Sequence, residues 1–277
     1  MKKDGEGKEE SALRRNVNLF QAVMYGVGLI LGAGIYVLIG DVAGIAGNAM
    51  WISFIVAAFI ATCTGLSYAE LSSMFPKSAA EYVYVKNAFG NNAAAFIAGW
   101  LIIFVAMVSA AAVAIGFSGY FSSLFPQIDP LLSAAVLVLI LSIVNFVGIK
   151  ESVWMNTTFT FIELAGLSII ILAALLFGSH QIDYYEMPPA VADMPLSAGA
   201  IVAGAGLIFF AYYGFENLAN ISEETKNASK VIPKALIISI TITSAVYILV
   251  ALSAITLVGW EELSLSEAPL ATSAERA

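Results

Sequence analysis

The sequence predicts an all-α membrane protein that crosses the bilayer about seven times. Of its 277 residues, 60% are hydrophobic and 12% are charged, whereas about a quarter of the residues in soluble domains are charged. Long charge-free runs recur along the chain, and a helix needs ~20 such residues to cross a ~30 Å hydrocarbon core. The runs cover residues 19–40, 49–69, 93–128, 131–149, 164–179, 194–215 and 235–260. Composition and run length together exclude a soluble globule.

Taken in order, most of these runs are long enough to span the membrane unaided. The fifth run is too short unless its helix extends back through Glu163 to about Ser152, so this span is expected to hold a carboxylate. Polar connections are predicted at 76–92, 180–193 and 216–234. In the first of them, Tyr82, Tyr84 and Phe89 suit an amphipathic segment at the inner interface, where aromatic rings favour the headgroup level.

Three parts are expected along the chain. Residues 1–17 are polar and charged, without the apolar core and cleavage site of a signal peptide, and are predicted to form a cytoplasmic tail. Residues 18–178 contain the first five spans. Residues 179–277 contain an outer loop, two further spans and a segment that turns apolar again at Ala268, which we interpret as the approach to an eighth helix.

The placement of cationic residues predicts the orientation. With a cytoplasmic N-terminus, eleven of the twelve Lys and Arg residues lie on the inner side, and only Arg276 lies outside. The inner set is Lys2, Lys3, Lys8, Arg14, Arg15, Lys77, Lys86, Lys150, Lys226, Lys230 and Lys234. Because inner loops are enriched in Lys and Arg, we expect a multi-pass protein of the cytoplasmic (plasma) membrane with its N-terminus inside.

Several function classes are not expected. The net charge of −8 without a basic stripe argues against a nucleic-acid partner. The single Cys63 cannot form an internal disulfide, and His180 has no second His or Cys nearby to make a metal site. Because nucleophile motifs, P-loops and dinucleotide fingerprints are missing from the sequence, we expect neither an enzyme nor a bound cofactor.

Glycines at the centre of the first span predict a break in its helix. Gly28 and Gly32 alone fit a packing seam against a neighbouring helix. Gly34 lies ~200° around the helix from Gly32, which a single seam does not explain. A break at membrane depth is tolerated only where the freed backbone groups face protein or a wet cavity. The half-helix beginning near Ile35 would then aim its N–H groups at the break, an arrangement that suits a carboxylate.

The sixth span predicts a second break. Small residues lead there into an aromatic cluster that contains Gly214. Breaks in the first and sixth spans are the spacing expected of two five-helix inverted repeats, whose leading helices meet at the substrate. On this reading the first repeat is complete and the second includes two of its helices.

Three motifs carry a family resemblance that extends over residues 15–277. They are "GAGIYVLIG", "YAELSSMFPKSAAEYVYVKNAFG" and "FFAYYGFENLANISEETKNASKVIPKAL". In this order they resemble the amino acid-polyamine-organocation (APC) superfamily, in its amino acid permease branch. The resemblance implies a LeuT-type fold of about twelve spans, of which the sequence would contain the N-terminal portion, truncated after the seventh helix.

The resemblance also implies a substrate site. Backbone N–H groups of the first break would bind the substrate carboxylate, carbonyl groups of both breaks would bind its amine, and Phe210 would close over it. The corresponding residues are Gly32, Ala33, Gly34 and Ile35 for the carboxylate, and Ile30, Phe210, Ala211 and Tyr213 for the amine, with Gly214 in the second break. Ala33 stands where relatives often carry Ser or Thr, and Ala79 and Ala80 replace the family's usual paired glycines.

Three carboxylates are expected at or near membrane depth, where each needs a partner, water or a proton. Glu70 and Glu216 lie near inner span ends, and a structural role is predicted for both, through bonds to loop backbone or a Lys. Glu163 lies near mid-depth, where proton-coupled relatives carry a lysine. It is a candidate for coupling to a proton, with sodium as the other possible ion, or a neutral, hydrogen-bonded packing residue.

The sequence therefore predicts a secondary active transporter that moves amino acids by alternating access, with lipid bilayer and substrate as partners. A seven-helix receptor or retinal protein is a rival class. It would need an outer N-terminus, which the charge bias opposes, and, for a retinal pigment, a lysine in the seventh span as well, whereas 235–260 contains none. The other alternative is a truncated, non-transporting fragment or a binding or regulatory membrane subunit.

Overall fold

A computed structural model describes residues 15–147, 149–178, 182–189 and 197–277 of the chain, and the side chains of 147–157 and 197 are not among the described features. Residues 1–14 of the predicted tail lie outside this range, as does His180. The helices are α1 (Leu19–Ile30), α2 (Gly34–Ala46), η1 (Gly47–Ala49), α3 (Met50–Met74), α4 (Ala80–Phe89), α5 (Asn92–Leu124), α6 (Pro130–Val147), α7 (Ile149–Phe177), α9 (Ser197–Ala211), η2 (Phe215–Glu224), α10 (Ala228–Val258), α11 (Trp260–Leu265) and α12 (Pro269–Glu275).

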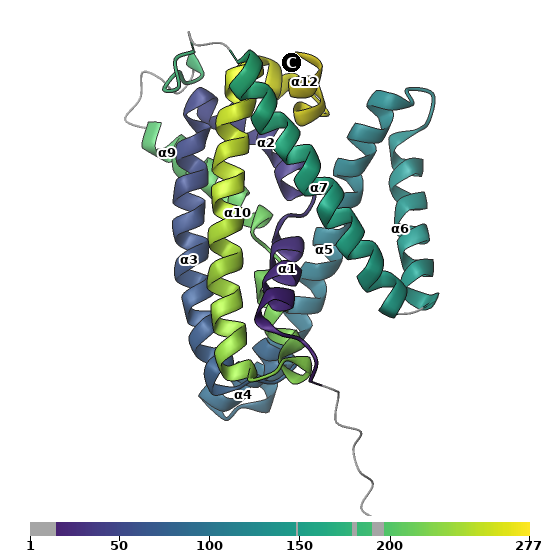
Figure 1. The fold of residues 1–277 in the computed structure, drawn as a ribbon, viewed down its shortest axis with the longest axis vertical. Helices are drawn as coiled ribbons and strands as arrows, with labels where there is room; N and C mark the ends of the chain where they lie inside the picture. The colour runs from purple at the N-terminus through teal and green to yellow at the C-terminus, as the bar shows by residue number, and fades with distance from the viewer. Residues whose placement is uncertain (1–14, 148, 179–181, 190–196) are drawn as a thin grey trace, which may run out of the picture.

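The predicted class, an all-α polytopic membrane fold, is confirmed. Five helical segments of the described chain are long and apolar enough to cross a membrane, and two shorter apolar helices accompany them. The five are Gly34–Met74, Asn92–Leu124, Thr158–Phe177, Ala198–Glu224 and Ala228–Val258, and the shorter two are Leu19–Ile30 and Pro130–Phe146. Successive crossings alternate in direction, so that α1 begins at the lower end of the bundle and α12 lies at the upper end (Figure 1).

Helix α10 is the scaffold of the bundle. It contacts α1, α3, α7 and η2, and α9 packs against α2 and α3. Residues with small side chains, such as Ala235, Ala251 and Ala254, are fully buried along it and let these neighbours approach closely. By contrast, α5 and α6 stand to one side in Figure 1 and expose large apolar side chains. The two broken helices therefore lie against the best-packed part of the molecule.

The fifth span extends back past Ser152, as predicted, because α7 is one helix over Ile149–Phe177. The last polar connection differs from the prediction. The connection predicted at 216–234 is instead mostly helical, formed by η2 and the start of α10. Its mixed charge concealed a helical stripe, since Phe215, Leu218 and Ser222 are buried on one side of η2. Pro233 lies inside α10, in its second turn, and does not close a loop ahead of it.

The connection after α3 forms the helix α4, as the aromatic residues suggested. Tyr84 is buried in it, whereas Phe89 is exposed. Ala79 precedes α4 in the left-handed conformation, with φ of 56°. An alanine therefore holds a backbone shape that glycine adopts more readily. Asn220 of η2 anchors this turn, because its side-chain oxygen accepts the Ala80 N–H at 3.1 Å.

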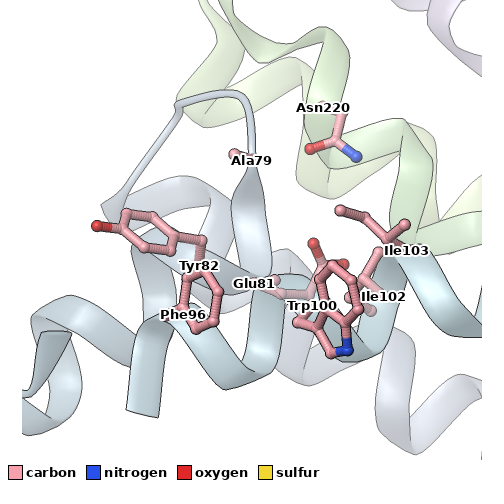
Figure 2. Close-up of a pocket in the computed structure, with 9 residues that line it drawn as sticks. Ala79, Glu81, Tyr82, Phe96, Trp100, Ile102, Ile103 and Asn220 are labelled. Carbon is pink, nitrogen blue, oxygen red and sulfur yellow. The ribbon is translucent and has the colours of Figure 1, made fainter. Parts of the chain in front are cut away.

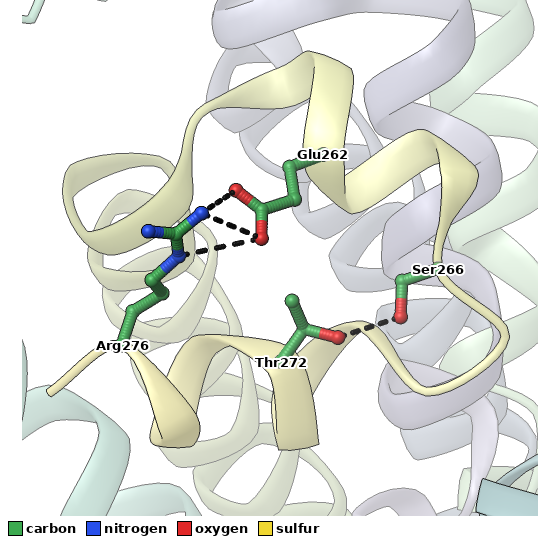
Figure 3. A network of polar contacts seen from close by, with 4 residues as sticks. All are labelled: Glu262, Ser266, Thr272 and Arg276. Atoms are coloured by element: carbon green, nitrogen blue, oxygen red, sulfur yellow. Dashed lines mark hydrogen bonds and ion pairs between the residues drawn. The ribbon is translucent and has the colours of Figure 1, made fainter.

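The segment expected to approach an eighth helix folds back against α2. It forms α12, whose Leu270 is buried and whose Pro269 packs against Gly40. Figure 3 shows the contacts that close this turn: Arg276 pairs with Glu262 at 2.9 Å, and the hydroxyls of Ser266 and Thr272 lie 2.7 Å apart.

Candidate functional site at the two helix breaks

The first span is broken between α1 and α2, as predicted. Leu31, Gly32 and Ala33 are not helical, and the Gly32 N–H turns back to the Ile30 carbonyl at 2.7 Å. Helix α2 begins at Gly34, one residue before the predicted position, and Ala33 provides no side-chain cap. The first N–H groups of a helix have no acceptor within the helix. The start of α2 is therefore a positive, uncapped end inside the protein.

The second break lies between α9 and η2. Helix α9 ends at Ala211, and Tyr212 and Tyr213 continue in turns whose N–H groups bond the carbonyls of Phe209 and Phe210 at 3.1 and 3.0 Å. Gly214 follows with φ of 129°, a backbone conformation that side chains rarely adopt. The chain then resumes as the narrower 3₁₀ helix η2.

The two breaks lie directly against each other. A Cβ atom on Gly34 would come within 2.8 Å of the Ala211 Cα, and one on Gly214 would collide with the Leu29 carbonyl oxygen. Each break thus places a glycine where the backbone of the other passes. The gap between the half-helices is closed by main chain in this conformation.

Gly28 and Gly32 do not form the helix-packing seam that was the alternative interpretation of the first span. Gly28 packs against Thr160 of α7, whereas a Cβ on Gly32 would meet nothing closer than the Ile30 carbonyl oxygen at 4.0 Å. The two glycines therefore do not line one seam against one helix.

The side chains of the second break pack among themselves. Phe210, predicted to close over the substrate, stacks on Tyr213 with ring centroids 6.5 Å apart and planes 9° from parallel. Ile35 is fully buried beside the first break. The structure gathers all nine predicted residues at the two breaks, and their roles in binding stay predictions.

Tyr247 is a residue at this site that sequence reasoning missed. Its hydroxyl lies 2.7 Å from the Ile30 carbonyl oxygen and 3.1 Å from that of Ala211, so one group on α10 joins the carbonyl ends of both α1 and α9. The side chain is fully buried. A tyrosine within an apolar span could have pointed to this role, because a buried phenol hydroxyl needs a hydrogen-bond acceptor.

Glu216 is buried at the start of η2. Its carboxylate accepts the Gly214 N–H at 2.9 and 3.1 Å and the Asn217 amide at 3.2 Å. These are the local bonds that a structural role requires. Glu70 differs, because its side chain is exposed and its carboxylate has no hydrogen bond or ion pair to the described residues. The backbone or lysine contact expected of Glu70 is therefore missing from the described chain.

Glu163 lies at the middle of α7, next to the first break. The Tyr36 hydroxyl, from the first turn of α2, donates to the Glu163 main-chain carbonyl at 3.4 Å. One carboxyl oxygen of Glu163, Oε1, is buried and has no hydrogen-bond partner among the described residues. A buried carboxyl oxygen without a partner needs a proton or a cation.

The sequence profile of the amino acid permease family matches residues 17–276. The chain belongs to this family. The match confirms the predicted amino acid permease branch of the APC superfamily.

Similar proteins share about a third of its residues. The branched-chain amino acid permease BcaP of Bacillus subtilis is 33% identical, over 87% of this chain and 54% of that protein. The cationic amino acid transporter 4 of Mus musculus is 32% identical, over 93% and 43%. The methylthioribose transporter of Bacillus subtilis is 31% identical, over 88% and 55%. The chain thus spans about half the length of these relatives.

A cavity of about 400 Å³ lies away from the breaks of this permease-family chain. Figure 2 shows it beside α4 and α5, with Asn220 of η2 at its edge. Its lining residues are Ala79, Glu81, Tyr82, Phe96, Gly99, Trp100, Ile102, Ile103 and Asn220. Residues predicted to bind substrate do not line it. Within the described ranges, no group of three or more His, Cys, Asp or Glu residues is arranged to hold a metal.

Proposed function

We propose that the chain acts in secondary active transport of amino acids by alternating access, with the substrate bound where the two helix breaks meet. The observation that carries this proposal is the pairing of an uncapped helix start with converging helix ends. The N–H end of α2 is positive, whereas the carbonyl groups of Ile30 and Ala211 are negative helix ends that both lie within hydrogen-bonding distance of the Tyr247 hydroxyl. This polarity matches the two charges of an amino acid.

The backbone groups have distinct roles in this proposal. The substrate carboxylate binds the N–H groups at the start of α2, at Gly32, Ala33, Gly34 and Ile35. The ammonium group binds the carbonyls of Ile30, Ala211, Phe210 and Tyr213. Phe210, now stacked on Tyr213, then moves over the substrate. Main-chain recognition of this kind is common to all amino acids, so side-chain selectivity must come from other residues.

Amino acids are the proposed substrate class for two reasons. The family is that of amino acid permeases, and the names of two of the relatives specify amino acids as what they transport. Since a third relative is a methylthioribose transporter, the substrate screen should include that compound.

We also propose that the protein lies in the cytoplasmic membrane with its N-terminus inside. Helix α4 and the start of α10 lie at the same end of the bundle as the start of α1 (Figure 1). Lys77 and Lys226 precede these two helices, Lys86 lies in α4, and Lys230 and Lys234 lie in the first two turns of α10. Gathering of cationic residues at one end supports this orientation.

Labelled amino acid uptake into proteoliposomes, with and without a pH gradient, tests the function. We expect uptake that an unlabelled excess of the same amino acid abolishes. A correctly inserted protein that takes up neither branched-chain nor cationic amino acids would contradict the proposal. That result would favour the alternative of a non-transporting binding or regulatory subunit.

Glu163 is the proposed coupling residue, and the proton is the proposed coupling ion in preference to sodium. The buried, unpartnered Oε1 beside the first break supports this role. In Glu163→Gln, uptake should lose most of its dependence on the pH gradient, because the amide cannot take up and release the proton. Glu262→Gln is the matched control, since Glu262 is exposed at the outer end and pairs with Arg276. Full pH dependence in Glu163→Gln would rule out this role.

A further inference from the structure

Two of the carbonyl groups proposed to bind the substrate amine, those of Ile30 and Ala211, already lie within hydrogen-bonding distance of a side-chain hydroxyl in this structure. The Ile30 oxygen accepts two bonds of 2.7 Å, from the Tyr247 hydroxyl and from the Gly32 N–H. The Ala211 oxygen lies 3.1 Å from the same hydroxyl. A carbonyl oxygen has two lone pairs. An arriving ammonium group can therefore bind the Ile30 oxygen only by replacing one of its present donors.

The hydroxyl is held at this point by rigid surroundings. Tyr247 is fully buried, and its ring packs edge-on against Tyr212 and Phe54, with centroids 5.4 and 6.4 Å away. Its helix, α10, is continuous from Ala228 to Val258 and contacts α1, α3 and α7. The Tyr247 hydroxyl thus reaches both breaks from a separate helix, and neither break could form these hydrogen bonds by itself.

A donor at this position has a physical purpose when substrate is absent. The last carbonyl groups of a helix have no N–H donor within the helix. Leaving a buried polar group without a hydrogen bond costs about 1–3 kcal/mol. The ends of α1 and α9 are both buried at the closed gap, and a single phenol hydroxyl lies within bonding distance of both.

We propose that the Tyr247 hydroxyl stands in for the amino group of the substrate while the site is closed and unliganded. On binding, the ammonium takes over the Ile30 carbonyl and the hydroxyl gives it up. Tyr247 thus sets how tightly amine-bearing ligands bind, by stabilising the unliganded state against them. The inference rests on the proposed function, because it takes these carbonyls to be the amine subsite.

Tyr247→Phe tests the inference, since it removes the hydroxyl and keeps the ring that packs on Tyr212 and Phe54. The purified full chain is titrated with leucine and with lysine, each compared with the carboxylic acid that lacks only the α-amino group. We expect amino acid affinity to rise about five- to thirtyfold, because the unliganded variant loses the hydroxyl at both carbonyls, which leaves the Ile30 oxygen with the Gly32 N–H alone. Affinity for the deaminated acids should not rise, because they cannot supply that donor.

Hydrogen exchange of the unliganded protein gives a second readout that needs no substrate. Loss of the hydroxyl should speed amide exchange at Leu31–Ala33 and at 212–214 together, because Tyr247 joins both breaks. Tyr84→Phe is the matched control. Tyr84 is also buried, and its hydroxyl has no hydrogen-bond partner within the described part of the chain. This control should change neither exchange nor affinity.

The outcomes separate this inference from the proposed function. If the unaltered chain binds amino acids and Tyr247→Phe binds them equally or more weakly, the stand-in role is overturned and the transport proposal stands. Unchanged exchange at either break in the variant also overturns it. If neither protein binds any amino acid, the proposed function fails, and the stand-in role fails with it.

Discussion

The two helix breaks are alike at their carbonyl ends and different at their N–H ends. At the carbonyl ends, Ile30 and Ala211 share the Tyr247 hydroxyl. At the N–H ends, α2 begins without a side-chain cap, whereas the start of η2 is bonded by the Glu216 carboxylate through Gly214. An anion of the protein already occupies the second break. The difference indicates that a substrate carboxylate should go to the first break, where the helix start is still uncapped.

The backbone that follows each break also favours an anion at the first break more than at the second. The first break returns at once to a regular α-helix of 13 residues, whose aligned peptide dipoles favour an anion at its start. The second continues as a 3₁₀ helix, with poorer hydrogen-bond geometry. The start of α2 thus favours an anion, as the proposed function requires, whereas the second break places carbonyl groups and aromatic rings beside it.

The largest expected effect is at the glycine that brings the breaks together. Gly214→Ala should destabilise the protein by about 2 to 6 kcal/mol, from a strained φ of 129° and a collision with the Leu29 carbonyl. Thermal unfolding in detergent measures this, and substrate binding should be lost in parallel.

Gly206→Ala is the matched control for this substitution. Gly206 lies in α9, and a Cβ there would meet nothing within 4 Å. Alanine should stabilise the helix by about 0.5–1 kcal/mol. Equal effects of the two substitutions would show that contact between the breaks is not the cause.

A smaller effect is expected from making the two N–H ends alike. Glu216→Ala leaves the buried Gly214 N–H without an acceptor and should cost about 1–3 kcal/mol. Glu216→Gln keeps one acceptor oxygen and should cost about 1 kcal/mol or less. Chemical denaturation compares the two, and added acetate should partly restore Glu216→Ala but not Glu216→Gln. A loss of stability in Glu216→Ala that acetate leaves unchanged would argue against the anion interpretation of the second break.

The smallest expected effect concerns the turn before α4, which is bonded to η2. Ala79 adopts φ of 56° beside Ala80, whose N–H bonds Asn220. Ala79→Gly should raise stability by about 1 kcal/mol, because glycine adopts this conformation without steric cost. The midpoint of thermal unfolding measures the gain. A lower midpoint would mean that the anchor of the second break depends on the alanine side chain.

The sequence predicted the breaks well and their contacts poorly. The start of α2 at Gly34 was predicted to within one residue, because clustered small residues weaken a helix whatever its surroundings. The helical character of 215–224 was missed, because its charged residues hid a buried stripe of Phe215, Leu218 and Ser222. The fixed backbone contact expected for Glu70 is missing among the described residues, since nearness to a span end does not determine which way a side chain points.

By itself, the sequence determined the class of the protein, its spans, its two breaks and its family, because hydropathy, glycine placement and motif order are local properties of the chain. Only the tertiary structure decided which groups meet at the breaks. The Tyr247 hydroxyl reaches the carbonyl of a residue 217 positions away, and Gly34 meets Ala211 across the gap. Such contacts depend on how separate helices pack against α10, and the residue pattern of a single helix does not predict them.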